Sequence, residues 1–189
     1  GKERLTFALP GMKCSAINLG NFNFSHNLIF DDAIFSGEVS FYGAKFNKSA
    51  WFNNTTCNGH ASFYAAKFMG NALFTDATFN NTAWFSDATF NGNAWFDDAT
   101  FNGNARLNDA KFMGDAWFED ATFNGEVSFE SAIFNGYTRF EKATFETTTS
   151  FSMVEFKGRV HFVNSTFNYK FSFSANSFDK GCWFTKSKF

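Results

Sequence analysis

The chain has 189 residues and a formal net charge of −2 at pH 7. So weak a charge argues against proteins that bind nucleic acid or anionic membranes through bulk electrostatic attraction. The sequence shows no apolar run long enough to span a bilayer and no signal-peptide pattern at its start. We therefore expect a cytoplasmic location and no membrane contact from this segment.

Residues 1–20 lie outside the repeat that fills the rest of the chain. Pro10-Gly11 marks a turn in this segment, and Leu19 fits a degenerate first repeat. We expect residues 1–20 to form an N-terminal cap or leader with a short helix. The chain begins at Gly1 and ends at Phe189 in mid-pattern, which fits a processed or excised piece of a longer protein.

From Phe24 onward, a large apolar residue recurs at alternating steps of six and five residues. In the middle of the chain each of these residues follows an alanine two positions earlier. The large residues there are Phe85, Phe90, Phe96, Phe101, Leu107, Phe112, Phe118 and Phe123. The eleven-residue period repeats fifteen times from Phe24 to Phe189 without an insertion. This predicts one continuous solenoid over residues 21–189, with no internal domain boundary.

A helical interpretation of this period fails. On an α-helix, steps of five and six residues would place successive phenylalanines roughly 140° apart instead of on one stripe. Most repeats also carry a glycine, such as Gly92 and Gly103, and each would cost a helix about 1 kcal/mol. We expect these glycines at corners, where a positive φ is needed. The intervening Ala-x-Phe triplet is extended, with Ala and Phe on the inner side.

This pattern resembles the pentapeptide-repeat proteins, whose unit has a central Leu or Phe, a small residue two positions earlier and a polar corner. The resemblance covers residues 24–189, with one extra residue in every second unit, as in some Phe-rich members. It implies an all-β fold: a right-handed quadrilateral β-helix of about 7.5 coils of 22 residues, with a core of stacked phenylalanines. On such a fold, the outward residues sort into four different faces.

One face carries a row of large apolar residues, namely Trp51, Leu73, Trp95 and Trp117. A contiguous exposed apolar row usually marks a contact site, and tryptophan is a common interface anchor. The alternative is that tryptophan only covers and stiffens the sheet through cross-strand pairs. We take this row as the candidate interaction face for an unknown protein partner.

The next face carries six threonines in register, from Thr56 to Thr166. Threonine suits strands and stacks well on itself, so a structural role is the simpler interpretation. Ice binding is the alternative, although solenoid ice-binding proteins use paired threonine rows and this face has one.

The corner between these two faces is acidic and includes Asp97, Asp98, Glu119 and Asp120. Some pentapeptide-repeat proteins imitate DNA with a negative surface and bind type II topoisomerases. The resemblance therefore implies gyrase as an alternative partner. The other interpretation is that aspartate suits corners and keeps the rod soluble. Because these carboxylates face open solvent, we expect no shifted pKa values among them.

Catalysis finds little support in the sequence. Cys57 and Cys182 take core positions and lie too far apart for a disulfide. The sequence has no metal-ligand spacing and no phosphate-binding loop. We predict a non-enzymatic rod without cofactor or metal, which serves as a protein–protein interaction module. The alternatives are the topoisomerase-binding DNA mimic and a structural spacer of a larger chain. The open C-terminal end also predicts a homodimer that forms through this end. We expect no direct nucleic-acid binding.

Overall fold

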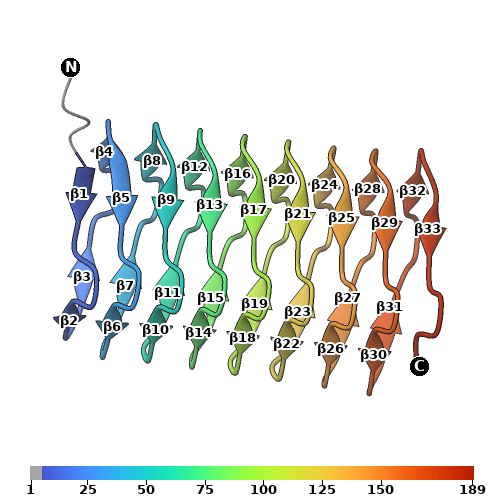
Figure 1. The fold of residues 1–189 in the computed structure, drawn as a ribbon. Coiled ribbons are helices and arrows are strands. Elements are labelled where there is room, and N and C mark those ends of the chain that lie inside the picture. The colour runs from blue at the N-terminus through green and yellow to red at the C-terminus, as the bar shows by residue number, and fades with distance from the viewer. Residues whose placement is uncertain (1–5) are drawn as a thin grey trace.

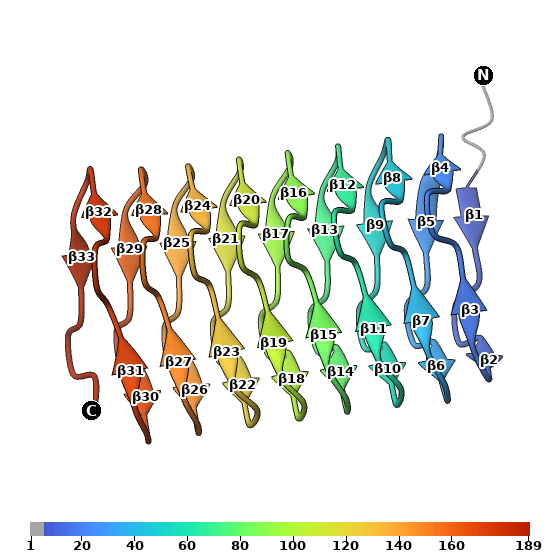
Figure 2. The ribbon, with the colours of Figure 1, turned by 180° about the vertical axis from the view of Figure 1, so that it is seen from behind.

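The computed structural model describes residues 6–189, and every regular element in that range is a β-strand of two or three residues. Neighbouring strands within each of the four sheets are parallel, and the chain visits the sheets in turn. Figures 1 and 2 show the resulting rod from opposite sides, with β1 and β33 at opposite ends. The predicted all-β quadrilateral solenoid is confirmed, with about eight coils.

Sheet A has nine strands, and its outer side carries the tryptophan row. Its members are β1 (Thr6–Ala8), β5 (Asn27–Ile29), β9 (Ala50–Trp51), β13 (Ala72–Leu73), β17 (Ala94–Trp95), β21 (Ala116–Trp117), β25 (Thr138–Arg139), β29 (Val160–His161) and β33 (Cys182–Trp183).

Sheet B has eight strands, and its outer side carries the threonine row. Its members are β2 (Lys13–Cys14), β6 (Ile34–Phe35), β10 (Thr56–Cys57), β14 (Thr78–Phe79), β18 (Thr100–Phe101), β22 (Thr122–Phe123), β26 (Thr144–Phe145) and β30 (Thr166–Phe167).

Sheets C and D complete the rod with eight strands each. Sheet C holds β3 (Ile17–Asn18), β7 (Val39–Ser40), β11 (Ala61–Ser62), β15 (Ala83–Trp84), β19 (Ala105–Arg106), β23 (Val127–Ser128), β27 (Thr149–Ser150) and β31 (Phe171–Ser172). Sheet D holds β4 (Asn23–Phe24), β8 (Lys45–Phe46), β12 (Lys67–Phe68), β16 (Thr89–Phe90), β20 (Lys111–Phe112), β24 (Ile133–Phe134), β28 (Glu155–Phe156) and β32 (Ser177–Phe178).

The first coil begins earlier than the sequence pattern indicated. Residues 6–20 contain β1, β2 and β3, which pair with the second coil, so the short helix expected there is wrong for these residues. Residues 1–5 of the expected cap lie outside the described residues. Lys13 pairs with Ile34, 21 residues later, whereas Ile17 pairs with Val39, 22 residues later. The first coil is therefore one residue shorter than the others. Because of this missing residue, the first coil does not follow the eleven-residue period and could not be recognised from it.

The core consists of the predicted phenylalanine columns with alanine between them. Phe96 is fully buried and stacks on Phe74 at 4.9 Å and on Phe118 at 5.0 Å between ring centroids. It also meets the edge of Phe85 at 5.3 Å and 87°. Offset-stacked and edge-on pairs are the favoured arrangements of aromatic rings, each contributing about 0.5–1.5 kcal/mol beyond burial. The Phe96 ring thus joins its own coil to both neighbouring coils.

The corners use glycine for a reason other than the one expected. In the described residues, positive φ among glycines occurs at Gly11, Gly43 and Gly181, so Gly92 and Gly103 do not need it. A Cβ on Gly103 would lie 2.4 Å from the carbonyl carbon of Asn81, one coil earlier. Glycine is present there because stacked corners approach closely.

Positive φ falls instead on the second residue of each two-residue corner. Non-glycine residues hold most of these positions, including Asp76 (57°), Asp98 (57°) and Asp120 (55°). Aspartate and asparagine tolerate this left-handed conformation better than most residues. The acidic corner therefore has a conformational role in addition to its charge.

Candidate functional site

The tryptophan row lies on sheet A as predicted. Trp51 pairs with Leu73, Leu73 with Trp95, and Trp95 with Trp117, each in direct register between adjacent coils. All four side chains are half-buried. The rings of Trp95 and Trp117 lie 5.7 Å apart, and their buried indole N–H groups have no hydrogen-bond partner within residues 6–189. The row is a continuous apolar surface whose outer part reaches solvent.

The row continues toward the C-terminus through a guanidinium group. The Arg139 guanidinium carbon lies 5.3 Å from the centroid of the Trp117 ring and 5.0 Å from that of Tyr137. Both distances are within the range of cation–π attraction. Arg139 also lies 3.7 Å from the Glu119 carboxylate. One cation is therefore held by two aromatic faces and a carboxylate.

Tyr137 completes a polar cluster that the sequence did not reveal. Its hydroxyl lies 2.7 Å from Nδ1 of His161, which in turn lies 3.2 Å from Oε1 of Glu141. Burial raises the pKa of the Tyr137 hydroxyl. The sequence could have indicated that Tyr137 lies beside Arg139, because the two are two residues apart and alternation puts residues i and i+2 on one side of a strand. The 22-residue offset was also needed, because His161 lies one coil later.

The acidic corner joins sheets A and B, directly beside the tryptophan row. Oδ1 of Asp97 accepts a hydrogen bond from the Glu119 backbone N–H at 3.0 Å. Burial raises the pKa of Asp97 from 3.8 to about 6, and the negative charges of Glu119 and Asp98 act in the same direction. The N–H bond and Arg139 oppose the shift. The expectation of an unshifted acidic corner was therefore wrong for Asp97, because its carboxyl is half-buried.

Two of the four predicted acidic residues are paired with cations of the next coil. The Lys142 ammonium lies 3.0 Å from Asp120 and 3.6 Å from Glu119, which also faces Arg139. Among the described residues, no lysine or arginine nitrogen lies within 4.0 Å of Asp97 or Asp98. The negative surface is thus partly neutralised at its C-terminal end and uncompensated at Asp97 and Asp98.

Sheet B carries a second polar row beside the threonines. Asn80 donates its side-chain N–H to Asn58, Asn102 to Asn80, and Asn124 to Asn102, at 2.7, 2.7 and 2.8 Å. Each asparagine lies two residues after a threonine of the row. The amides therefore form a ladder of hydrogen bonds along the rod, which favours a structural role for this side of the molecule.

A separate aromatic cluster lies between sheets C and D. Tyr42 and Tyr64 stack with ring centroids 5.5 Å apart, and both rings are exposed. They line a shallow depression together with Trp84 and Ser62. Trp84 lies on β15 of sheet C, and the two tyrosines occupy corner positions one coil apart.

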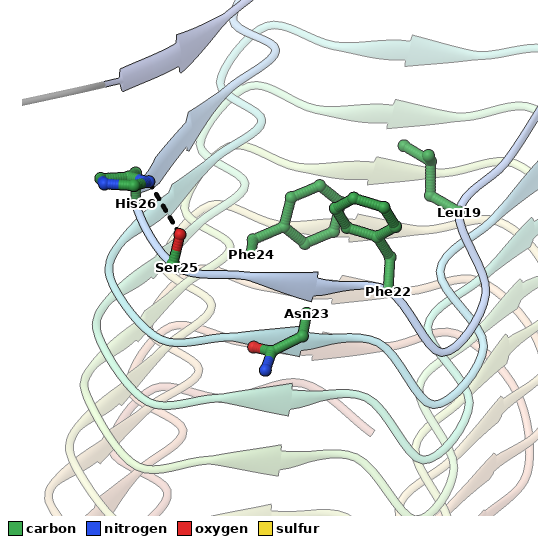
Figure 3. Close-up of a pocket in the computed structure, with 6 residues that line it drawn as sticks. All are labelled: Leu19, Phe22, Asn23, Phe24, Ser25 and His26. Atoms are coloured by element: carbon green, nitrogen blue, oxygen red, sulfur yellow. Dashed lines mark hydrogen bonds between the residues drawn. The ribbon is translucent and has the colours of Figure 1, made fainter.

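An apolar depression opens at the N-terminal end of the rod (Figure 3). The rings of Phe22 and Phe24 lie side by side above β4, with centroids 4.8 Å apart, and Leu19 faces them. The Ser25 hydroxyl lies 2.8 Å from Nδ1 of His26 at its rim. Phe22 occupies a position that alanine holds in the next coils, and its side chain is exposed.

Cys57 and Cys182 lie in apolar surroundings. Burial raises the pKa of the Cys57 and Cys182 thiols to about 12, as for groups in apolar surroundings. Within residues 6–189, no cluster of three or more histidine, cysteine, aspartate or glutamate side chains is placed to bind a metal ion. No helix in that range has the length and apolar character to cross a membrane.

Comparison with known proteins agrees with this architecture. A family model described as pentapeptide repeats, in nine copies, matches segments that together extend from residue 19 to residue 175. The chain belongs to the pentapeptide-repeat family. A comparison with curated proteins finds no match.

One solved structure similar to this chain is HetL, a pentapeptide repeat protein involved in heterocyst differentiation regulation from the cyanobacterium Nostoc sp. strain PCC 7120. The two sequences are 10% identical, and the alignment covers 100% of this chain and 90% of that one. The TM-score is 0.24, too low to support an argument about function.

Proposed function

We propose that this chain is a protein–protein interaction module that binds its partner through the outer side of sheet A. The observation that supports this proposal is the row Trp51, Leu73, Trp95 and Trp117, which stays partly exposed over four consecutive coils. Large aromatic side chains that are partly desolvated on a rigid surface are the usual anchors of interfaces. The core already contains its own phenylalanine columns, so the row is an addition to the fold.

The test is a comparison of partner capture by the wild type and by a variant with Trp95→Ser and Trp117→Ser. The control carries Thr100→Ser and Thr122→Ser on sheet B, at the same level of the rod. We expect proteins that the wild type and control retain to be lost from the tryptophan variant. If the variant only loses stability and captures the same proteins, the tryptophans cover the sheet and the proposal is wrong.

A rival function is DNA mimicry toward gyrase, supported by the carboxylates of Asp76, Asp97 and Asp98, which face no cation of the described chain. The pairing of Glu119 and Asp120 with Lys142 weakens this rival. A supercoiling assay separates the two. Inhibition that disappears when Asp97, Asp98, Glu119 and Asp120 become amides would favour mimicry, and no inhibition at large molar excess would remove it.

Two further proposals concern oligomeric state and cellular location. A homodimer through the C-terminal end is supported by the exposed rings of Phe171, Phe178 and Phe189 in the last coil. The solution mass, measured over a range of concentrations, tests it. A cytoplasmic location is the second proposal, and the free thiols of Cys57 and Cys182 are compatible with a reducing compartment. If the protein binds no partner in these tests, the remaining proposal is that the rod is a structural spacer of a larger chain.

A further inference from the structure

The tryptophan row and the acidic corner form one surface. Trp95 is followed two residues later by Asp97, and Trp117 by Glu119, so each tryptophan has a carboxylate beside it where sheet A ends. On the opposite side, Asp115 precedes Trp117 by two residues and accepts the backbone N–H of Tyr137 at 2.8 Å. Trp117 thus lies between two carboxylates, whereas Trp95 has Asp97 on one side and the neutral Asn93 on the other. We call the part around Trp95 and Trp117 the aromatic–acidic surface.

The charge of this surface is strongly one-sided. Its carboxylates are Asp76, Asp97, Asp98, Asp115, Glu119 and Asp120. The cations that the described chain supplies are Arg139 and Lys142, both at the C-terminal border and both paired with Glu119. A surface with this excess of negative charge attracts cationic partners and repels acidic ones.

Arg139 shows which cation the surface accommodates. Its guanidinium is held by the Trp117 and Tyr137 rings at 5.3 and 5.0 Å and by the Glu119 carboxylate at 3.7 Å. A planar guanidinium stacks on an aromatic face and still pairs with a carboxylate at its edge, whereas an ammonium is more strongly hydrated and gains less from the ring. One coil earlier, Trp117 itself fills the position over Trp95 that Arg139 fills over Trp117, so the outer part of the Trp95 ring is what a ligand can reach. The Asp97 carboxylate beside that ring has no cation of the described chain within 4.0 Å.

From these observations we propose that the aromatic–acidic surface binds arginine side chains of a basic polypeptide segment, at Trp95, Asp97 and Asp98. This inference rests on the proposed function, because it names the chemistry of the partner that sheet A would bind. It differs from DNA mimicry in one respect. A DNA mimic relies on the field of many carboxylates and accepts lysine and arginine alike, whereas stacking on tryptophan favours arginine.

The test uses two capped peptides of equal length and charge, hexaarginine and hexalysine, with hexaglutamate as the negative control. Binding is followed through the indole N–H signals of the five tryptophans in ¹⁵N-labelled protein. We expect hexaarginine to shift the signals of Trp95 and Trp117 and to leave Trp84, on sheet C, unchanged. Hexalysine should bind several-fold more weakly, and hexaglutamate should cause no shift.

A pair of charge-matched variants locates the site. The variant Asp97→Asn with Asp98→Asn should weaken hexaarginine binding roughly tenfold, equivalent to about 1.4 kcal/mol. The control, Asp87→Asn with Asp109→Asn, removes the same charge at the corner between sheets C and D. It should change the affinity little, because exposed charges further apart than a Debye length of about 8 Å are screened at physiological salt.

Several outcomes would overturn the inference. Equal affinity for the arginine and lysine peptides, equal weakening by the two double variants, or no indole shift at millimolar hexaarginine would each do so. The proposed function fails separately. If partner capture depends on Trp95 and Trp117 but is indifferent to Asp97, Asp98 and salt, sheet A is an interface without an arginine site.

Discussion

Replacing Asp97 with asparagine is predicted to stabilise the protein at neutral pH. Asp97 is half-buried, and burial raises its pKa from 3.8 to about 6, so its ionised form is held at a cost. Asparagine has nearly the same shape, and its Oδ1 can still accept the Glu119 backbone N–H. The substitution therefore removes the charge while keeping the hydrogen bond that joins the two coils.

The size of the effect follows from the shift. A difference of about two pKa units corresponds to roughly 3 kcal/mol, at 1.36 kcal/mol for each unit. Solvent screens a carboxyl that is only half-buried, so we reduce this to about 1 kcal/mol. The folded protein binds more protons at this site than the unfolded chain between pH 3.8 and about 6. The free energy of unfolding therefore falls as pH rises through that window, and the full cost is present above it.

The measurement is urea unfolding of the wild type and Asp97→Asn at pH 4, 5, 6 and 7, followed by tryptophan fluorescence. The variant should match the wild type at pH 4 and exceed its free energy of unfolding by about 1 kcal/mol at pH 7. Asp98→Asn, which changes the same charge at an exposed neighbour, is the control. A gain that is absent at pH 7, or that is equally large at pH 4, would refute the role given to burial.

The remaining predictions concern the core, a corner and the amide ladder. Phe96→Ala should cost about 3–5 kcal/mol in urea unfolding, because it leaves a cavity between stacked rings; a cost below about 1 kcal/mol would contradict the stacked core. Gly103→Ala should lower the melting temperature more than Gly20→Ala. The new Cβ would lie 2.4 Å from a backbone carbon at position 103, but 3.2 Å from a side-chain oxygen at position 20. Equal effects of the two substitutions would contradict the argument that stacked corners approach closely. Glu146 follows Asn124 in the ladder, and its carboxylate cannot donate a hydrogen bond to the Asn124 side chain. Glu146→Asn should therefore raise the free energy of unfolding by about 0.5–1 kcal/mol. A lower free energy of unfolding would show that the hydrogen bond which the Glu146 carboxylate accepts from Asn168 matters more.

Much of the fold could be predicted because one period controls it. Once Phe85 and Phe96 are recognised as inward residues, alternation fixes which neighbours point outward, and the 22-residue coil fixes which of them stack. The pairing of Trp95 with Trp117 and of Thr78 with Thr100 confirms both steps. The position of a row on the rod therefore followed from counting.

What the sequence did not reveal depends on local geometry within the corners. The period cannot distinguish a glycine needed for a positive φ from one needed for close approach, and Gly103 proved to be the second kind. It also cannot show that Lys142 reaches back to Asp120, because long side chains can extend in either direction along the rod. The missing residue before Ile17 concealed the first coil, since a one-residue change interrupts the repeat without interrupting the sheet.

Because paired strands have a constant offset in sequence, the length of the rod changes in fixed steps of one coil. From Ile17, which pairs with Val39, to Lys188, which bridges to Thr166, partners in adjacent coils are 22 residues apart. Removal of 22 consecutive residues, such as 97–118, would join Phe96 to Glu119 and leave all four sheets in register. The two ends would approach by one strand spacing, about 4.8 Å. Duplication or loss of whole coils can thus set the distance between surface features in fixed steps, because the register of the sheets is kept and each lost pairing is replaced by one at the equivalent position.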